Sequence, residues 1–181
     1  FYLNLAKYLN EDLHTLYILL AENFYKTGDY ISAKKIYKDL SYFGSTFKWY
    51  STKQISKILI FEKNQSKSVN LLRDTYKNLP NKNIYQTFDL AEFLKNNEKF
   101  TESIKYYTEV LNKIDTTHSL YPEAKDGRGV AYERIGEWDK AENDFLSSLE
   151  ISPDQAYVIN YLAYSWIEKG KNIEKSLKML E

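Results

Sequence analysis

Small residues recur along this sequence at a nearly constant spacing, each inside the same short apolar pattern. A large apolar or aromatic residue stands four positions after every one of them, as expected of neighbours on one face of a helix. Successive small residues are separated by 35, 35, 38 and 35 positions. These anchor residues are Ala33, Ser68, Ser103, Ala141 and Ser176. A period of this length predicts an array of helical repeats without a single central core.

A second set of small residues predicts a partner helix in each repeat. Twelve positions before the first four anchor residues stand Ala21, Ser56, Ala91 and Gly129. Nine positions before the same anchors stand Phe24, Leu59, Leu94 and Tyr132. The small residue lets two helices approach closely, and the larger one fills the space beside the contact. We therefore expect each repeat to be a helical hairpin.

Turn residues between and after these helices support the same register. Glycine or asparagine, which can end a helix in the left-handed conformation, marks the turn inside four hairpins. These residues are Gly28, Asn96, Asn97, Gly136 and Gly170, whereas the second repeat has no glycine there. Pro80 and Pro153 fall at the same phase and predict the ends of second helices. The last repeat is expected to carry one extra residue near Asn172.

Two segments depart from the repeat pattern. Residues 41–49 form an aromatic-rich stretch around Gly44, which we interpret as a connector. Residues 114–122 lengthen a later junction by about three positions, as the spacing of 38 requires. Insertions in helical repeat arrays are expected in loops at one edge of the array.

The pattern resembles the tetratricopeptide repeat (TPR). The matching positions are Ala21, Phe24, Gly28, Tyr30, Ala33 and Tyr37, and then Gly129, Tyr132, Gly136, Trp138, Ala141, Phe145 and Pro153. The resemblance implies an all-α fold, a right-handed α-solenoid of helix-turn-helix repeats, extending as one array over residues 1–181. The expected divisions are 1–13 (end of a preceding repeat), 14–48, 49–83, 84–121, 122–155 and 156–181 (a last, incomplete repeat).

A narrower resemblance rests on longer strings, at residues 13–30, 127–145, 151–155 and 160–166. These strings are similar to the C-terminal part of long TPR adaptor proteins of bacterial envelopes. That similarity implies a non-enzymatic adaptor, periplasmic or membrane-anchored on the periplasmic side through an N-terminal segment. Because the sequence starts at Phe1 without methionine, we expect it to be cut from a longer protein.

Composition excludes several other functions. With 25 basic and 25 acidic residues the net charge is zero, which disfavours nucleic-acid binding. No apolar run approaches the ~20 residues needed to span a bilayer. Cysteine is absent, and His14 and His118 are far apart, so neither a metal motif nor a cofactor site is expected.

No catalytic constellation is recognisable, and the histidines are expected to cap helices or face solvent. The carboxylate pairs Glu133 with Glu137 and Glu142 with Asp144 are expected on solvated helix faces or turns. The glycines of Gly127-Arg128-Gly129 lie within a helical pattern and predict close packing rather than a phosphate-binding loop.

The expected binding surface is the inner, concave wall, which the first helix of each repeat lines in such arrays. Tyrosines interleaved with charged residues suit capture of a protein or peptide partner. The residues projected onto this wall are Tyr25, Lys26, Tyr50, Lys53, Lys57, Phe61, Tyr85, Phe88, Glu92, Lys95, Glu133, Arg134, Tyr157, Asn160 and Tyr164. Lys53 and Lys57 lie one helical turn apart and favour an acidic partner segment between them.

Three functions remain open at the level of sequence. The first is a non-catalytic scaffold that binds a partner polypeptide through the concave face. The second is an accessory interaction domain of a larger enzyme. The third is a structural, self-assembling envelope component, because the C-terminal end has no polar capping helix and would expose apolar surface.

Overall fold

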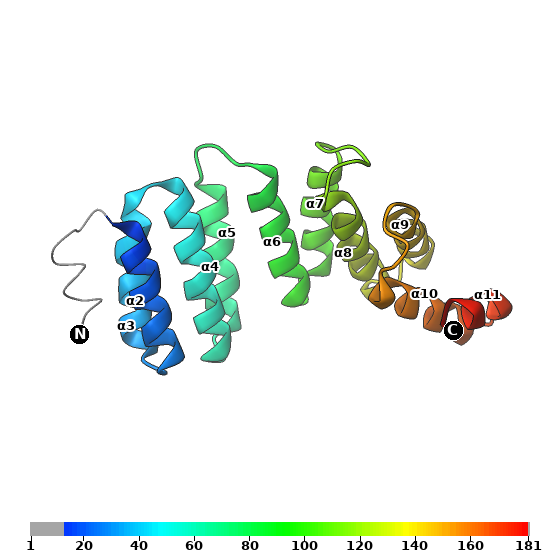
Figure 1. Ribbon diagram of the computed structural model, residues 1–181, viewed down its shortest axis with the longest axis horizontal. Coiled ribbons are helices and arrows are strands. Elements are labelled where there is room, and N and C mark those ends of the chain that lie inside the picture. Colours follow the sequence, from blue (N-terminus) through cyan, green and yellow to red (C-terminus); the bar gives the residue numbers. More distant parts are fainter. Residues whose placement is uncertain (1–12, 181) are drawn as a thin grey trace. The chain divides into compact units, whose positions relative to one another are not determined.

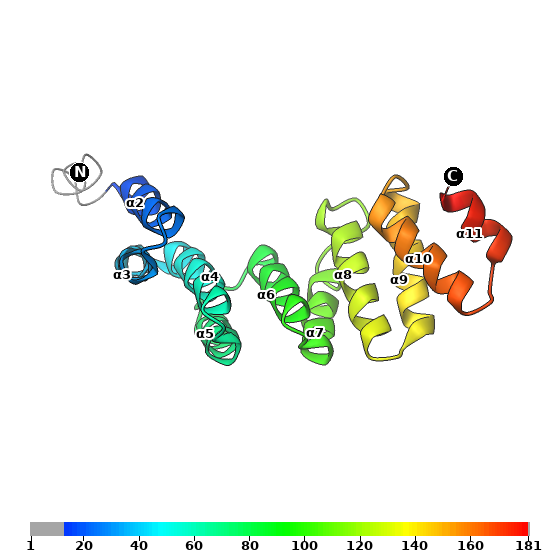
Figure 2. The ribbon, with the colours of Figure 1, turned by 90° about the horizontal axis from the view of Figure 1, so that it is seen from below.

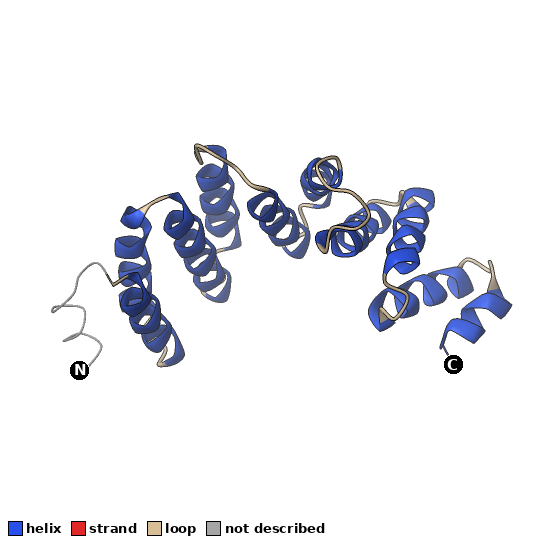
Figure 3. Ribbon diagram, turned by 45° about the horizontal axis from the view of Figure 1, so that its top comes forward, coloured by secondary structure: helices blue, strands red, loops and turns tan. Residues whose placement is uncertain are grey.

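The fold consists of helices joined by short turns (Figure 1). The structure is a computed structural model, and it describes residues 13–180. These residues contain no strand (Figure 3), so the predicted all-α fold class is confirmed. Residues 1–12, which we assigned to the end of a preceding repeat, lie outside the described residues.

The helices follow one another as antiparallel pairs, the hairpins that the sequence predicted. They are α2 (His14–Lys26), α3 (Tyr30–Leu40), α4 (Ser45–Phe61), α5 (Gln65–Lys77), α6 (Ile84–Asn96), α7 (Phe100–Leu111), α8 (Leu120–Arg134), α9 (Trp138–Ile151), α10 (Ala156–Glu168) and α11 (Ile173–Leu180), with a short 3-10 turn, η1 (Ser41–Phe43), before α4. Figure 2 shows α8 and α9 side by side in one such hairpin. Helix α5 ends before Pro80 and helix α9 ends before Pro153, as expected.

Contacts between residues divide the chain into two compact units, Phe1–Gln86 and Thr87–Glu181. In the described residues, the first unit holds α2 to α5 and the second holds most of α6 and all of α7 to α11. Within this part of the chain, no helix is both long and apolar enough to cross a membrane.

The core of the first unit forms where small residues of paired helices meet. Ala21 and Ala33 are fully buried at the α2–α3 contact, as the repeat pattern requires. Ser56 and Ser68 take the same positions in α4 and α5, where the Ser68 hydroxyl donates to the Ser56 carbonyl oxygen at 2.7 Å. This bond satisfies a polar group that burial would otherwise leave without a partner. Trp49 is buried as well, and its ring packs edge-on against that of Tyr76 in α5.

The core of the second unit depends on two glycines in α8. A Cβ atom on Gly127 would lie 2.4 Å from the Tyr107 hydroxyl oxygen, and one on Gly129 would lie 2.7 Å from a ring carbon of Phe145. Both rings are fully buried. Close packing by these glycines, which we expected from the sequence, is therefore confirmed. Trp166 of α10 closes the other side of this core.

The turns within the hairpins all contain a residue with positive φ, although only three of these residues are glycine. They are Gly28, Lys63, Glu98, Gly136 and Gly170, with φ between 59° and 84°. In the third repeat our expectation was wrong, because Glu98 rather than either neighbouring asparagine adopts the left-handed conformation. The extra residue of the last repeat is confirmed, since Asn172 has φ 48° directly before α11.

The two irregular segments differ in how well the sequence described them. The aromatic connector at 41–49 is shorter than expected, because Gly44, with φ 119°, is followed at once by α4. Residues 45–49 thus form the first turn of that helix. The lengthened later junction at 114–122 corresponds to the loop between α7 and α8, although residues 120–122 already belong to α8.

The expectation of solvated carboxylates in α9 was wrong. Asp144 is 1% exposed and forms ion pairs with Lys125 and Arg128 of α8. Glu142 accepts a hydrogen bond from the indole N–H of Trp166. Because their partners come from neighbouring helices, these carboxylates stabilise the packing of the second unit instead of facing water.

Candidate functional site

The residues predicted for binding in the first unit lie on α2 and α4. Tyr25 and Lys26 are exposed near the end of α2, and Lys57 and Phe61 are exposed on the second half of α4. Phe61 packs against the Tyr30 ring, with centroids 5.1 Å apart. These side chains present a mixed aromatic and basic surface.

The remaining predicted residues of this unit differ in their exposure. Tyr50 is half-buried, and its hydroxyl donates to Glu22 at 3.3 Å. Burial, followed by the nearby Glu22 charge, raises the pKa of Tyr50. Lys53 is also half-buried, whereas Tyr85, at the start of α6, is exposed. The part of these residues in binding stays a prediction.

The residues predicted in the second unit come together around two pockets. The structure places them on α6 (Phe88, Glu92 and Lys95), α8 (Glu133 and Arg134) and α10 (Tyr157, Asn160 and Tyr164). All except Phe88 and Glu92 line one or other pocket, and Tyr157 lines both. Helices separated in sequence thus contribute side chains to one continuous surface of the unit.

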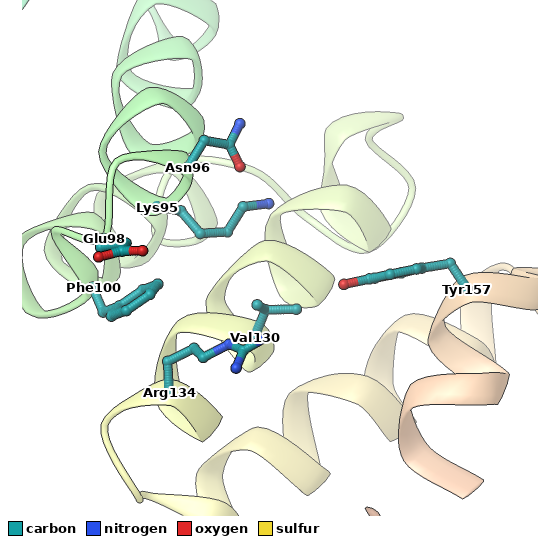
Figure 4. Close-up of a pocket in the computed structure, with 7 residues that line it drawn as sticks. All are labelled: Lys95, Asn96, Glu98, Phe100, Val130, Arg134 and Tyr157. Carbon is teal, nitrogen blue, oxygen red and sulfur yellow. The ribbon is translucent and has the colours of Figure 1, made fainter. Parts of the chain in front are cut away.

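The first of these, which we call the central pocket, has a volume of about 480 Å³. Its lining residues are Lys95, Asn96, Glu98, Phe100, Val130, Arg134 and Tyr157. Figure 4 shows Tyr157 reaching from α10 with its hydroxyl directed toward α8, and Arg134 lying beside Val130. The pocket combines apolar surface with charges of both signs, a composition suited to a peptide backbone with mixed side chains.

The second pocket, which we call the tyrosine pocket, has a volume of about 300 Å³. Its lining residues are Glu133, Tyr157, Asn160, Tyr161, Tyr164, Ser165 and Glu168. The Tyr161 hydroxyl donates to Glu133 Oε2 at 2.7 Å, and this ring lies 5.8 Å from the Tyr157 ring. Tyr157 and Tyr164 are 58% and 61% exposed, so both present large aromatic faces to a ligand.

Phe88 and Glu92 serve the packing beneath the central pocket. Glu92 accepts a hydrogen bond from the Tyr107 hydroxyl, and Lys95 Nζ lies 2.8 Å from the same carboxylate oxygen. Burial, and next the Glu92 charge, raises the pKa of Tyr107 well above its ordinary value. Phe88 packs edge-on against the Tyr107 ring at 6.0 Å. These contacts fix the position of Lys95 at the pocket wall.

Sequence reasoning missed seven residues that line the two pockets, namely Asn96, Glu98, Phe100, Val130, Tyr161, Ser165 and Glu168. It also missed Asp126, whose charge acts on Tyr157. Asp126 lies 15 positions before its anchor residue, the same phase as Lys53 and Phe88, so the register itself could have found it. Val130 was missed because the prediction selected aromatic, charged and amide side chains, and valine is none of these. Tyr161 was passed over because it stands at the phase of Gln54 and Asp89, which we did not project onto the inner wall in any repeat.

Asp126 is an unusual group in this surface. Its Oδ1 atom is buried and has no hydrogen-bond partner in the described part of the chain. Burial raises the pKa of Asp126 to about 6, and the charges of Glu92 and Glu123 add to this effect while that of Lys95 opposes it. Its charge also acts on Tyr157, whose pKa is raised mainly by burial.

The two histidines have packing and capping roles. His118 Nδ1 accepts a hydrogen bond from the backbone N–H of Leu120 at 3.1 Å, at the start of α8. The His14 ring stacks on Phe47, with centroids 4.5 Å apart. Among residues 13–180, no three His, Asp or Glu side chains are grouped to hold a metal ion.

The C-terminal helix α11 leaves Ile173 and Leu177 exposed. An apolar pocket of about 550 Å³ lies nearby, lined in part by Leu149, Pro153 and Ile159. Self-association through this end of the chain stays a prediction.

Known structures with a similar fold cover most of the chain, although no protein-family model and no curated protein matches the sequence. A structure of MamA from Desulfovibrio magneticus RS-1 is 12% identical, covering 93% of this chain and 91% of its own, with a TM-score of 0.70. Another MamA structure is 17% identical, covering 92% of this chain and 89% of its own, with a TM-score of 0.68.

YrrB, a TPR protein with an unusual peptide-binding site, is 17% identical to this chain. The similarity covers 98% of this chain and 88% of YrrB, with a TM-score of 0.64. At these identities the likeness concerns the fold, and it agrees with the hairpins, the anchor residues and the turns described above. The fold of this chain is therefore the helical-hairpin array seen in tetratricopeptide repeat structures.

Proposed function

We propose that this chain is a non-catalytic protein-interaction scaffold that binds an extended segment of a partner polypeptide on its second unit. The bound segment would lie across the first helices of successive hairpins, over the central pocket and the tyrosine pocket. The observation that carries the proposal is the position of Tyr157, which forms a wall of both pockets. One ligand that contacts both sides of this ring would bury a large aromatic surface.

The chemistry of the surface supports a peptide as the ligand. Exposed tyrosines supply rigid contact area at low entropic cost, and Arg134 and Asn160 supply hydrogen-bond donors at the rim. The peptide-binding site of YrrB, a protein of similar fold, is consistent with such a role. The bacterial-envelope setting rests on the sequence resemblance alone.

The experiment is selection of peptides from a random library on the whole immobilised chain, followed by titration calorimetry of the best peptide. Replacing Tyr157 with alanine should weaken binding by about tenfold or more, as expected for a central aromatic contact. Arg134→Ala should weaken it less, by about threefold, because a rim charge contributes little. Circular dichroism would show that each variant remains folded.

Tyr42 offers a matched control. It is 75% exposed, belongs to η1 in the first unit and lines neither pocket. Tyr42→Ala should change the dissociation constant by less than about twofold, since isolated surface contacts carry little binding energy. The proposal fails if no peptide saturates the chain, or if loss of Tyr42 weakens binding as much as loss of Tyr157.

A further inference from the structure

We infer that the tyrosine pocket is the subsite for a basic side chain of the bound partner segment, a lysine ammonium or an arginine guanidinium. This inference rests on the proposed function and names the side-chain chemistry that the partner must carry at one position. Three features of the pocket support it, namely its charge, its uncovered aromatic faces and its size.

The charges that line the pocket are all negative. Glu133 and Glu168 contribute carboxylates, and no Lys, Arg or His belongs to the lining. Glu133 uses Oε2 to accept the Tyr161 hydrogen bond. Its neighbour Arg134 lines the central pocket instead (Figure 4). The Arg134 Nε atom lies 3.6 Å from that same Glu133 oxygen. A cation in the tyrosine pocket would therefore meet two carboxylates, of which Glu133 is also approached by Arg134 from outside the lining.

Elsewhere in this unit, cations of the chain itself cover the aromatic faces. Lys169 Nζ lies 4.9 Å from the Trp138 ring centroid, and Lys175 Nζ lies 5.1 Å from that of Trp166. Tyr132 has two cations within 6 Å of its ring centroid. Such contacts are favourable because the face of an aromatic ring carries partial negative charge.

By contrast, the rings of the tyrosine pocket have no such partner. Among residues 13–180, no Lys or Arg lies over Tyr157, Tyr161 or Tyr164. The pocket thus combines open aromatic faces with carboxylates, the two groups that attract an organic cation. A basic side chain entering from a partner would satisfy both at once.

Other ligand classes fit the pocket less well. An anion would be repelled by Glu133 and Glu168, and an apolar side chain would remove water from these carboxylates without replacing it. The volume of about 300 Å³ lies at the lower limit of pockets that hold whole small molecules, so it suits one long side chain.

The test uses peptides with randomised flanks and a fixed central residue, either arginine, lysine, norleucine or glutamate, arrayed on a surface and probed with the whole chain. Arginine and lysine peptides should retain about fivefold more protein than norleucine peptides, as expected for one cation on an aromatic and acidic site. Glutamate peptides should retain the least. Added salt should reduce the preference, because the attraction is partly electrostatic.

The variant is the double substitution Glu133→Gln with Glu168→Gln. It should remove most of the preference for a basic centre, by lowering the retention of arginine and lysine peptides relative to that of norleucine peptides. A glutamine carbonyl at position 133 can still accept the Tyr161 hydrogen bond, which protects the fold. Glu109→Gln is the control, because Glu109 pairs with Lys113 on α7 and lines neither pocket.

The outcomes separate this inference from the proposed function. Binding of peptides without any preference for a basic centre would overturn the inference and leave the scaffold function standing. A basic preference that survives in the double variant would also overturn it. If no peptide series is retained at all, both the inference and the proposed function fail.

Discussion

Arg128 and Asp144 form a two-pronged ion pair that joins α8 to α9. Arg128 Nε lies 2.6 Å from Asp144 Oδ2, and one terminal nitrogen of the same guanidinium lies 2.8 Å from Oδ1. Lys125 Nζ reaches Oδ1 at 2.9 Å, and Thr108 accepts from Arg128 at 3.0 Å. Asp144 thus neutralises two cations of α8 that are enclosed between the helices.

We predict that Asp144→Ala lowers the free energy of unfolding by about 3–5 kcal/mol, because it leaves two enclosed cations without their counter-charge. Chemical denaturation followed by circular dichroism measures this loss. Lys140→Ala is the control, since that lysine forms an exposed ion pair with Glu137 and should cost less than about 1 kcal/mol. Equal losses in the two variants would contradict the prediction.

A second prediction concerns the glycine that faces the buried tyrosine ring. Replacement of a glycine in a helix by alanine usually stabilises the helix by about 1 kcal/mol. Gly127→Ala should instead destabilise the chain by about 1–3 kcal/mol, because its new methyl group would overlap the enclosed Tyr107 ring. The measurement is the shift in thermal midpoint. An increase in midpoint would show that this ring can move aside.

The third prediction is a pH dependence that arises from Asp126. Its pKa is raised from 3.8 to about 6 in the folded chain, so its contribution to stability is present below pH 3.8 and is lost as pH rises through 6. Asp126→Asn removes this dependence. The variant should be more stable than the parent by about 2 kcal/mol at pH 7.5, and nearly equal to it near pH 4.

Denaturation curves at the two pH values test that sign. The groups that interact with Asp126 are Lys95, Glu92, Glu123, Tyr107 and Tyr157, and all of them remain in the variant. If the two chains differ in stability by the same amount at both pH values, protonation of Asp126 is not the cause of the difference. A parent chain that is more stable than the variant at pH 7.5 would contradict the prediction outright.

The fourth prediction concerns Lys63, which has φ 59° in the turn between α4 and α5. A left-handed conformation costs a residue with a side chain about 1 kcal/mol, a cost that glycine avoids. Lys63→Gly should therefore raise the free energy of unfolding by up to about 1 kcal/mol. The same change at the exposed Lys67, inside α5, should lower it by about 1 kcal/mol. Urea denaturation of both variants checks the opposite signs.

The hairpins could be predicted from sequence because they depend on residues that repeat. Ala33 and Ala141 recur in one register, and each packs at the contact of two paired helices. Such a contact accepts only small side chains, so it leaves a signal in every repeat. Turn conformations were harder to predict, because the hairpin forces Glu98 into a left-handed conformation that its residue type does not favour.

The candidate site was predictable only in part. Tyr157 and Arg134 stand out as aromatic and charged residues that project from first helices, and both line the central pocket. Asp144 carried no such signal, because its partners come from another helix and an isolated acidic residue usually faces solvent. Which charges are neutralised within the chain, and which are left for a partner, depends on packing that local pattern does not encode.

The chain has only three tryptophans, and Trp49 lies in the core of the first unit whereas Trp138 and Trp166 belong to the second. Their intrinsic fluorescence therefore distinguishes the units without any attached dye. A version that keeps Trp49 alone would report melting of residues near the beginning, and one that keeps Trp166 alone would report melting near the end. Comparing the two transitions would reveal whether denaturation proceeds cooperatively or in stages.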